Sequence, residues 1–260
     1  SVFSFYTLIS RVLGYIRDIL IAFFLGASIF ADAFFVAFRL PSTFRRLFAE
    51  GTFNAAFIPS YTSEKIISRK KSKKFADEVF SLLTLALLII VLLAEIFTPY
   101  LVYLIAPGFY ENSEKFDLAV ELTRITFPFL LFVSLSSFFS GVLNSNNKFA
   151  AAAAAPIILN IILIISLVVS YVLNLDFAKN LSYSVTLAGL IQLLFLIICT
   201  KNYYKPSIKF KIIVKSKLKL FFKKLLPSIF SSGVTQINIL IGTIIASFEA
   251  GAVSYLYYAD

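Results

Sequence analysis

The sequence is poor in the residues that carry covalent and metal chemistry: it has one cysteine, Cys199, and no histidine, methionine or tryptophan. One cysteine excludes an internal disulfide and any metal site made of several cysteines. The absence of histidine excludes imidazole catalysis and imidazole metal ligands within these 260 residues. Cys199 lies in an apolar run, so we interpret its thiol as buried and inert.

The sequence also lacks an initial methionine and a cleavable signal peptide. Its first segment, SVFSFYTLISRVLG, has neither a basic n-region nor a small-residue cleavage site. Both ends of the chain fall inside helix-like patterns, so we expect a piece of a longer protein.

Charge is scarce as well, since only 15% of the residues are charged while 59% are hydrophobic. A soluble globular domain has about 25% charged and about 45–50% apolar residues. Several apolar runs approach or exceed the roughly 20 residues that a helix needs to cross a bilayer. The clearest are Phe80–Leu104, Phe127–Leu143, Ala150–Leu173 and Leu187–Cys199. These features predict an all-α polytopic membrane protein.

Eight spanning helices are expected from these runs and from the polar connectors between them. They cover residues 3–26, 30–60, 76–105, 116–144, 151–174, 181–203, 224–249 and 252 onward.

Lysine and arginine in the connectors predict the orientation of the chain. The connectors 63–74, 144–148 and 201–224 hold six, one and nine basic residues, whereas the alternate set holds only Lys115 and Lys179. Basic loops stay on the cytoplasmic side, so we expect a cytoplasmic N-terminus. The basic loops then lie against anionic headgroups, and the segment Lys215–Lys224 has the composition of a short amphipathic helix on the inner surface.

Six arginines remain inside the predicted spans, at a cost of about 2.5–3.5 kcal/mol for each one that faces lipid at mid-membrane. A local pair with Glu121, or reach to the membrane surface, accounts for Arg124. The other five lie in the first two spans: Arg11, Arg17, Arg39, Arg45 and Arg46.

The helical repeat places the charges of the first span on one arc. At 100° per residue, Arg11, Arg17 and Asp18 share a polar arc with Gly14, opposite an arc of Ile, Val and Leu. The first helix is therefore expected to have a lipid face and a cationic face that lines a cavity.

In the second span, Asp32, Arg39, Arg46 and Glu50 align along one face, while Arg45 points elsewhere. Pairing of Arg39 with Asp32 and of Arg46 with Glu50 is one interpretation, in which the charges hold helices together. Pro41 is expected to kink this helix and shift the phase.

Only three acids, Asp18, Asp32 and Glu50, face the five arginines of the first two spans. Arginine stays charged at physiological pH and its planar fork matches phosphate. The residues alone thus indicate a phosphate-bearing substrate taken up between helices.

Several motifs resemble the MurJ (MviN) lipid II flippases of the MOP transporter superfamily. They are SRVLGYIRD (10–18), ADAFFVAFRLPSTFRRLFAEGTFNAAFIPSY (31–61), IAPGF (105–109), ITFPFLL (125–131), LNSNNKFAAAAAAPIILNI (143–161) and ASFEAGAVSYLYYAD (246–260).

The resemblance implies a two-lobed transporter fold of about fourteen helices in the bacterial inner membrane. Residues 1–203 would form the first lobe with helices 1–6, residues 204–223 a cytoplasmic linker with the amphipathic segment, and residues 224–260 helices 7 and 8 of the second lobe. The implied substrate is lipid II, undecaprenyl-diphosphate carrying the peptidoglycan disaccharide-pentapeptide, moved from the inner to the outer leaflet by alternating access.

By the same resemblance, cavity arginines that bind the diphosphate fall on Arg11, Arg17 and Arg45, and an acidic position that opens helix 2 falls on Asp32. With the residues that the helical repeat places beside them, the expected substrate-binding set is completed by Asp18, Arg39, Arg46 and Glu50. Membrane lipids are the other expected partners. No cofactor and no nucleic acid is expected, and coupling to sodium or the membrane potential is not assigned to residues.

Two other functions stay open at this point. One is a different exporter of the same superfamily, for polysaccharide lipids or for drugs, although an exporter of cationic drugs would favour intramembrane acids over arginines. The other is a membrane enzyme acting on polyprenyl phosphates, which would need acidic metal ligands or histidine near a membrane face.

Overall fold

The computed structural model describes residues 2–48, 52–207, 223, 233 and 235–259, and every regular element within them is helical. The elements in chain order are α1 (Val2–Leu25), α2 (Ile29–Phe48), α3 (Thr52–Ile67), α4 (Arg69–Ile96), α5 (Thr98–Ile105), the 3-10 helix η1 (Pro107–Glu111), α6 (Ser113–Thr126), α7 (Phe129–Asn144), α8 (Phe149–Leu173), α9 (Phe177–Thr200), a helix over Thr235–Ala246, and α11 (Ala252–Ala259).

Four stretches are long and apolar enough to cross a membrane: Arg69–Ile96, Ser113–Asn144, Phe149–Leu173 and Phe177–Thr200. With 24 residues, α1 is also long enough, at about 1.5 Å of rise per residue, but it carries charges in its interior. The all-α membrane fold expected from the apolar runs is therefore confirmed.

Several predicted helix boundaries are wrong, and polar caps and prolines explain why. Residues 63–74 are not an open loop, because α3 ends at Ile67 and α4 begins at Arg69, with the Ser68 side chain accepting from the backbone N–H of Lys71. The predicted helix 76–105 is divided at Phe97, with a proline in the first turn of α5. The predicted helix 116–144 is divided before α7 at Pro128, which has no N–H to donate.

Other predictions fall where the structure gives no placement. The amphipathic segment 215–224 lies outside the described residues, except for Lys223. In the predicted helix 224–249, most of the part that precedes Thr235 also lies outside them. The residues 49–51, between α2 and α3 in the predicted span 30–60, are also outside. The helix α2 runs through Pro41 without a break in its helical assignment.

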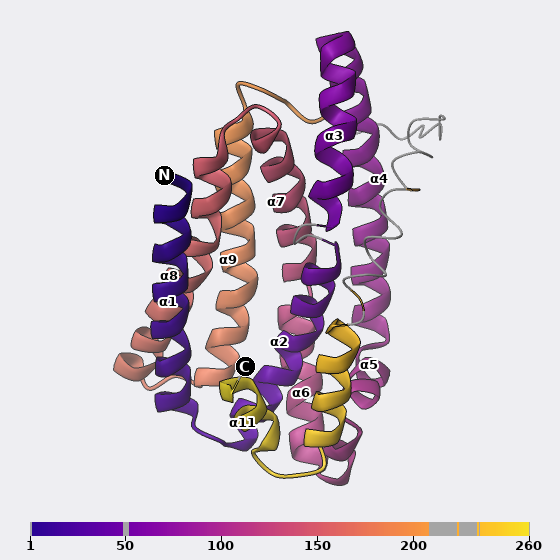
Figure 1. Ribbon diagram of the computed structural model, residues 1–260. Helices are drawn as coiled ribbons and strands as arrows, with labels where there is room; N and C mark the ends of the chain where they lie inside the picture. The colour runs from indigo at the N-terminus through magenta and orange to yellow at the C-terminus, as the bar shows by residue number, and fades with distance from the viewer. Residues whose placement is uncertain (1, 49–51, 208–222, 224–232, 234, 260) are drawn as a thin grey trace.

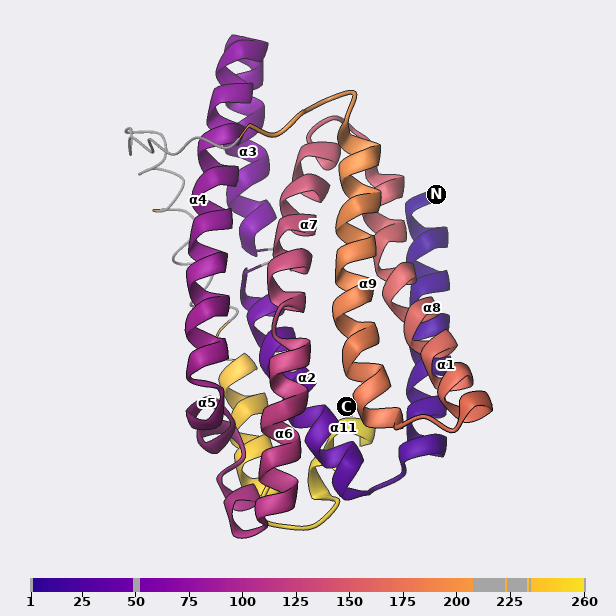
Figure 2. The same cartoon turned by 180° about the vertical axis from the view of Figure 1, so that it is seen from behind.

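The helices stand roughly upright in one bundle (Figures 1 and 2). α1 packs on α8, α8 on α9 and α9 on α7, while α2 packs on α6. Large phenylalanines fill the interior, and Phe57 and Phe138 pack with ring centroids 5.1 Å apart. The tips of α3 and α4 project at one end of the bundle, and α11 lies at the other (Figure 1).

Candidate functional site

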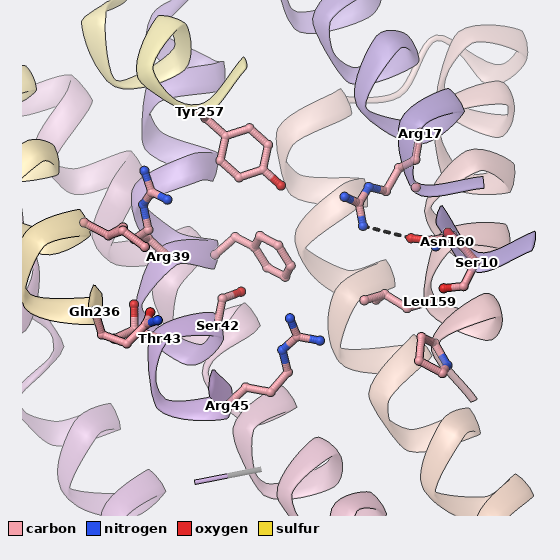
Figure 3. Close-up of a pocket in the computed structure, with 14 residues that line it drawn as sticks. Ser10, Arg17, Arg39, Ser42, Thr43, Arg45, Leu159, Asn160, Gln236 and Tyr257 are labelled. Atoms are coloured by element: carbon pink, nitrogen blue, oxygen red, sulfur yellow. Dashed lines mark hydrogen bonds between the residues drawn. The ribbon is translucent and has the colours of Figure 1, made fainter. Parts of the chain in front are cut away.

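A cavity of about 230 Å³ lies where α1, α2 and α8 meet the two C-terminal helices (Figure 3). Three arginines and no Asp or Glu line it among the described residues, so we name it the cationic cavity. Its lining consists of Ser10, Gly14, Arg17, Phe38, Arg39, Ser42, Thr43, Arg45, Pro156, Leu159, Asn160, Gln236, Ile239 and Tyr257.

Two neighbours hold the Arg17 guanidinium in place. Its Nε and Nη2 donate to Oδ1 of Asp18 at 2.9 and 2.7 Å, and its Nη1 donates to Oδ1 of Asn160 at 2.9 Å. The Asn160 amide is itself oriented, because its Nδ2 donates to the Ser10 carbonyl at 2.8 Å. These contacts use three of the five N–H donors of an arginine and leave two for a ligand.

Arg39 and Arg45 reach the cavity from the opposite side, on successive turns of α2 (Figure 3). Arg39 is buried, and its guanidinium carbon lies 5.8 Å from the ring centroid of Tyr257 on α11. Such a cation–π contact helps to hold the guanidinium beside the cavity. The cavity therefore presents positive charge from two helices toward one space.

A second space of about 550 Å³, the polar pocket, adjoins the cationic cavity and shares Ser10, Arg45 and Pro156 with it. Arg11 lines the polar pocket rather than the cationic cavity. Hydroxyl and amide side chains supply most of its other polar groups: Thr7, Asn54, Ser136, Ser137, Ser140, Asn144 and Gln192. The side-chain carbonyl oxygens of Asn54 and Asn144 are buried and accept no hydrogen bond from the described residues.

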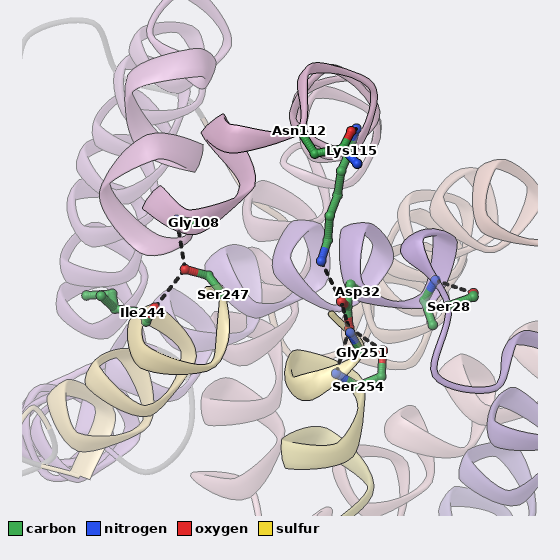
Figure 4. Close-up of polar contacts among 10 residues, drawn as sticks. Ser28, Asp32, Gly108, Asn112, Lys115, Ile244, Ser247, Gly251 and Ser254 are labelled. Atoms are coloured by element: carbon green, nitrogen blue, oxygen red, sulfur yellow. Dashed lines mark hydrogen bonds and ion pairs between the residues drawn. The ribbon is translucent and has the colours of Figure 1, made fainter. Parts of the chain in front are cut away.

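Asp32 lies away from both spaces and anchors a contact that we name the Asp32 clasp (Figure 4). Its Oδ2 accepts from Lys115 Nζ at 2.6 Å and from the Gly251 N–H at 2.9 Å. Its Oδ1 accepts from the Ser254 N–H at 2.9 Å and the Ser254 hydroxyl at 2.6 Å. The carboxylate is fully buried and caps the start of α11, where a helix favours negative charge.

The backbone of Gly108 adds to this junction. Its N–H donates to Ser247 Oγ at 3.0 Å, and a Cβ at Gly108 would overlap the backbone of Ser247 and Phe248. Only glycine permits so close an approach between η1 and the turn that precedes α11. The clasp and this contact together join α2, the η1–α6 region and the C-terminal helices.

The structure brings four of the predicted substrate-binding residues around the two adjoining spaces: Arg11, Arg17, Arg39 and Arg45. Asp18 contacts the cavity only through Arg17. The Arg46 side chain and Glu50 lie outside the described residues, and so does their predicted ion pair.

The predicted pairing of Arg39 with Asp32 is wrong, since the ion pair of Asp32 is with Lys115. Seven residues of helix separate Arg39 from Asp32 by about 10.5 Å along the axis, whereas Lys115 reaches Asp32 directly from α6. Likewise Glu121 pairs with Lys179, at 2.9 Å, and not with Arg124 one turn away.

Sequence reasoning missed Asn160, Tyr257, Gln236 and the buried Lys115. A lone asparagine in the run AAAAAAPIILNIILII was a usable signal, because an amide inside an apolar span needs a partner. Lys115 gave no such signal, because the sequence analysis placed it in a connector between two predicted helices.

Comparison with known proteins first defines the class. The fold matches that of a MOP superfamily transporter from Pyrococcus furiosus with a TM-score of 0.68, over 98% of this chain and 57% of that one, at 17% identity. The chain thus has the fold of part of such a transporter.

The family follows from closer matches. The family described as lipid II flippase MurJ matches residues 21–260. A probable lipid II flippase MurJ of Rickettsia prowazekii (strain Madrid E) is 42% identical over 264 residues, covering 100% of this chain and 51% of the relative. A solved structure of lipid II flippase MurJ in an inward closed conformation matches with a TM-score of 0.85 at 31% identity, over 99% of this chain and 53% of that one.

The chain belongs to the MurJ lipid II flippase family, a family of multi-pass membrane transporters. It spans about half the length of the curated relatives it matches. The resemblance seen in the sequence motifs is confirmed.

Proposed function

We propose that this chain forms the diphosphate-binding part of a flippase that moves lipid II from the inner to the outer leaflet by alternating access. The observation that carries the proposal is the cationic cavity, where Arg17, Arg39 and Arg45 converge and no Asp or Glu among the described residues belongs to the lining. A diphosphate carries several charged oxygens and suits guanidinium groups that approach from two sides.

The polar pocket supports a carbohydrate- and amide-bearing headgroup beside the diphosphate. Sugar hydroxyls and peptide amides are hydrogen-bond donors, and the hydroxyl and amide side chains that line the pocket can accept from them. Because Arg45 lines both spaces, it is placed at the boundary between diphosphate and headgroup.

The Asp32 clasp would explain how one end of the cationic cavity is kept closed. With a cytoplasmic N-terminus, the start of α2, η1 and the turn before α11 all lie at the outer face. The clasp then closes the outer end of the cavity, and its release would open that end. Separating α11 from α2 requires Asp32 to lose its three hydrogen bonds to Gly251 and Ser254, whereas its ion pair with Lys115 joins α2 to α6 and can remain.

The function is tested by growth rescue. The full-length protein is expressed in cells depleted of their own lipid II flippase, with its membrane level checked by immunoblot. We expect rescue, and we expect the purified protein to bind lipid II more tightly than the same lipid without its diphosphate. Failure to rescue at a normal membrane level would refute the assignment.

Asn160 is expected to act as a positioning residue for Arg17. Replacing Asn160→Ala removes one acceptor from Arg17 and one donor to the Ser10 carbonyl, so the guanidinium loses its fixed orientation. Hydrogen bonds to charged groups contribute about 1.5–3 kcal/mol, so lipid II affinity should fall about tenfold or more.

A matched control for Asn160→Ala exists on the next helix. Asn180 also bridges two helices through its amide, donating to the Ser166 carbonyl and the Ser170 hydroxyl, but it lies outside the cavity. Asn180→Ala should leave lipid II affinity unchanged. Asn160→Asp should keep the contact with Arg17 but lower affinity through its negative charge. Equal affinity losses for Asn160→Ala and Asn180→Ala would show a general packing effect.

A further inference from the structure

A second basic concavity, separate from the cationic cavity, lies between the first turns of α4 and the segment that follows α9. We name it the basic groove, with a volume of about 680 Å³. Figures 1 and 2 show the chain leaving α9 and crossing toward α3 and α4 at this end of the bundle. The groove shares no lining residue with the cationic cavity or the polar pocket.

The groove is held together by a buried polar contact. Tyr204, 4% exposed, donates its hydroxyl to Asp77 Oδ1 on α4 at 2.8 Å. The Ser207 N–H donates to the same oxygen at 3.3 Å. Burial, followed by the hydrogen bond and charge of Asp77, raises the pKa of the Tyr204 hydroxyl, so it remains a donor. These contacts fix the segment after α9 against α4.

The consequence is that two basic segments, more than a hundred residues apart in sequence, face one space. The basic lining residues are Arg69, Lys70, Lys73, Lys201 and Lys205, and no Asp or Glu lines the groove within the described residues. Ser72, Asn202 and the aromatic residues Tyr61, Tyr203 and Tyr204 complete the wall.

The preference of the groove for anions rests on its side chains. α4 begins at the groove, but α3 and α9 end beside it, so the helix dipoles oppose one another there. Five cationic side chains favour a compact anion with several acceptor oxygens.

We propose that the basic groove binds a phosphate-bearing anion, supplied either by an anionic phospholipid headgroup of the adjacent leaflet or by phosphate in solution. This site is separate from the substrate cavity and does not depend on the proposed transport function. It goes beyond the general attraction of basic loops to a membrane, because it requires the particular lysines that face the groove.

The chain offers a matched pair of variants for the test. Lys70→Gln/Lys73→Gln removes two groove charges, and Lys71→Gln/Lys74→Gln removes two charges of the same run, at the same spacing, that do not line the groove. Purified full-length protein is incubated with mixed phosphatidylglycerol and phosphatidylcholine, and retained lipid is counted by native mass spectrometry. The groove pair loses two of the five cations that line the groove, so it should lower phosphatidylglycerol affinity about 30-fold, and the control pair should lower it much less.

A second arm identifies the source of the phosphate. Inorganic phosphate is titrated against lipid-depleted protein by calorimetry, with both variant pairs in parallel. Loss of phosphatidylglycerol only in the groove variant supports a headgroup site. Loss of inorganic phosphate binding only in the groove variant supports a site for a soluble anion. Equal losses in both variants, or no loss in either, would overturn the proposal, because binding would then follow diffuse surface charge or no charge.

Discussion

Arg17→Ala is expected to abolish growth rescue in flippase-depleted cells while the protein reaches the membrane at a normal level. Asp18 and Asn160 hold the Arg17 guanidinium in the cavity and leave two N–H donors for a ligand. Truncating one partner of a buried charge pair costs about 2–5 kcal/mol, which corresponds to at least about a 30-fold loss of lipid II affinity. The measurement is growth together with a lipid II binding titration.

Arg17→Lys should rescue only weakly, although it keeps the charge. A lysine ammonium cannot contact Asp18 and Asn160 as a planar fork and still present two donors to a diphosphate. The control is Arg124→Ala, which removes an exposed arginine outside the cavity and should rescue fully. If Arg17→Ala also rescues fully, the arginines of the cavity are structural and the phosphate assignment is refuted.

Asp32→Asn is expected to open the end of the bundle that the Asp32 clasp holds together and to abolish rescue. Each carboxylate oxygen accepts two hydrogen bonds, whereas an asparagine has one acceptor oxygen and one amide donor. Whichever way the amide turns, two donors face an NH₂ group, and the buried Lys115 loses its counter-ion. Removing one partner of a buried ion pair costs about 3–5 kcal/mol.

Opening of the clasp is measured with a cysteine reporter. In a background without other cysteines, Val253→Cys on α11 is buried and should react slowly with a membrane-impermeant maleimide. Asp32→Asn should raise its labelling rate by at least about tenfold, given the energy of the broken pair. Wild-type labelling and wild-type growth in the Asp32→Asn variant would contradict the role of the clasp.

Two further variants separate the clasp from general destabilisation. Lys115→Met should have a smaller effect than Asp32→Asn, because Asp32 keeps the donors of Gly251 and Ser254. Asp176→Asn is the matched control: Asp176 caps α9 in an exposed position, and asparagine caps a helix as well as aspartate does. It should leave growth and labelling unchanged.

Apolar run length and charge placement were enough to predict an all-helical membrane protein, because both depend on the chemistry of consecutive residues. The helical repeat was also enough to place Arg11 and Arg17 on a polar face of α1, since side-chain direction follows from rise and twist. The helical repeat was less successful in predicting ion-pair partners on α2. Asp32 and Arg39 share a face but lie two turns apart, so a common face did not make them partners.

Contacts between distant segments were decided only by tertiary packing. One of the two acceptors of Arg17, Asn160, is 143 residues away on α8, and the counter-ion of Asp32 is 83 residues away on α6. The two walls of the basic groove are likewise joined by a contact between Tyr204 and an aspartate 127 residues earlier. Periodicity reports which way a side chain leaves its own helix, whereas the partner it meets depends on how the helices pack. The sequence could therefore indicate that cations face a cavity, and only the packed bundle could show which groups orient Arg17 and which groups surround Asp32.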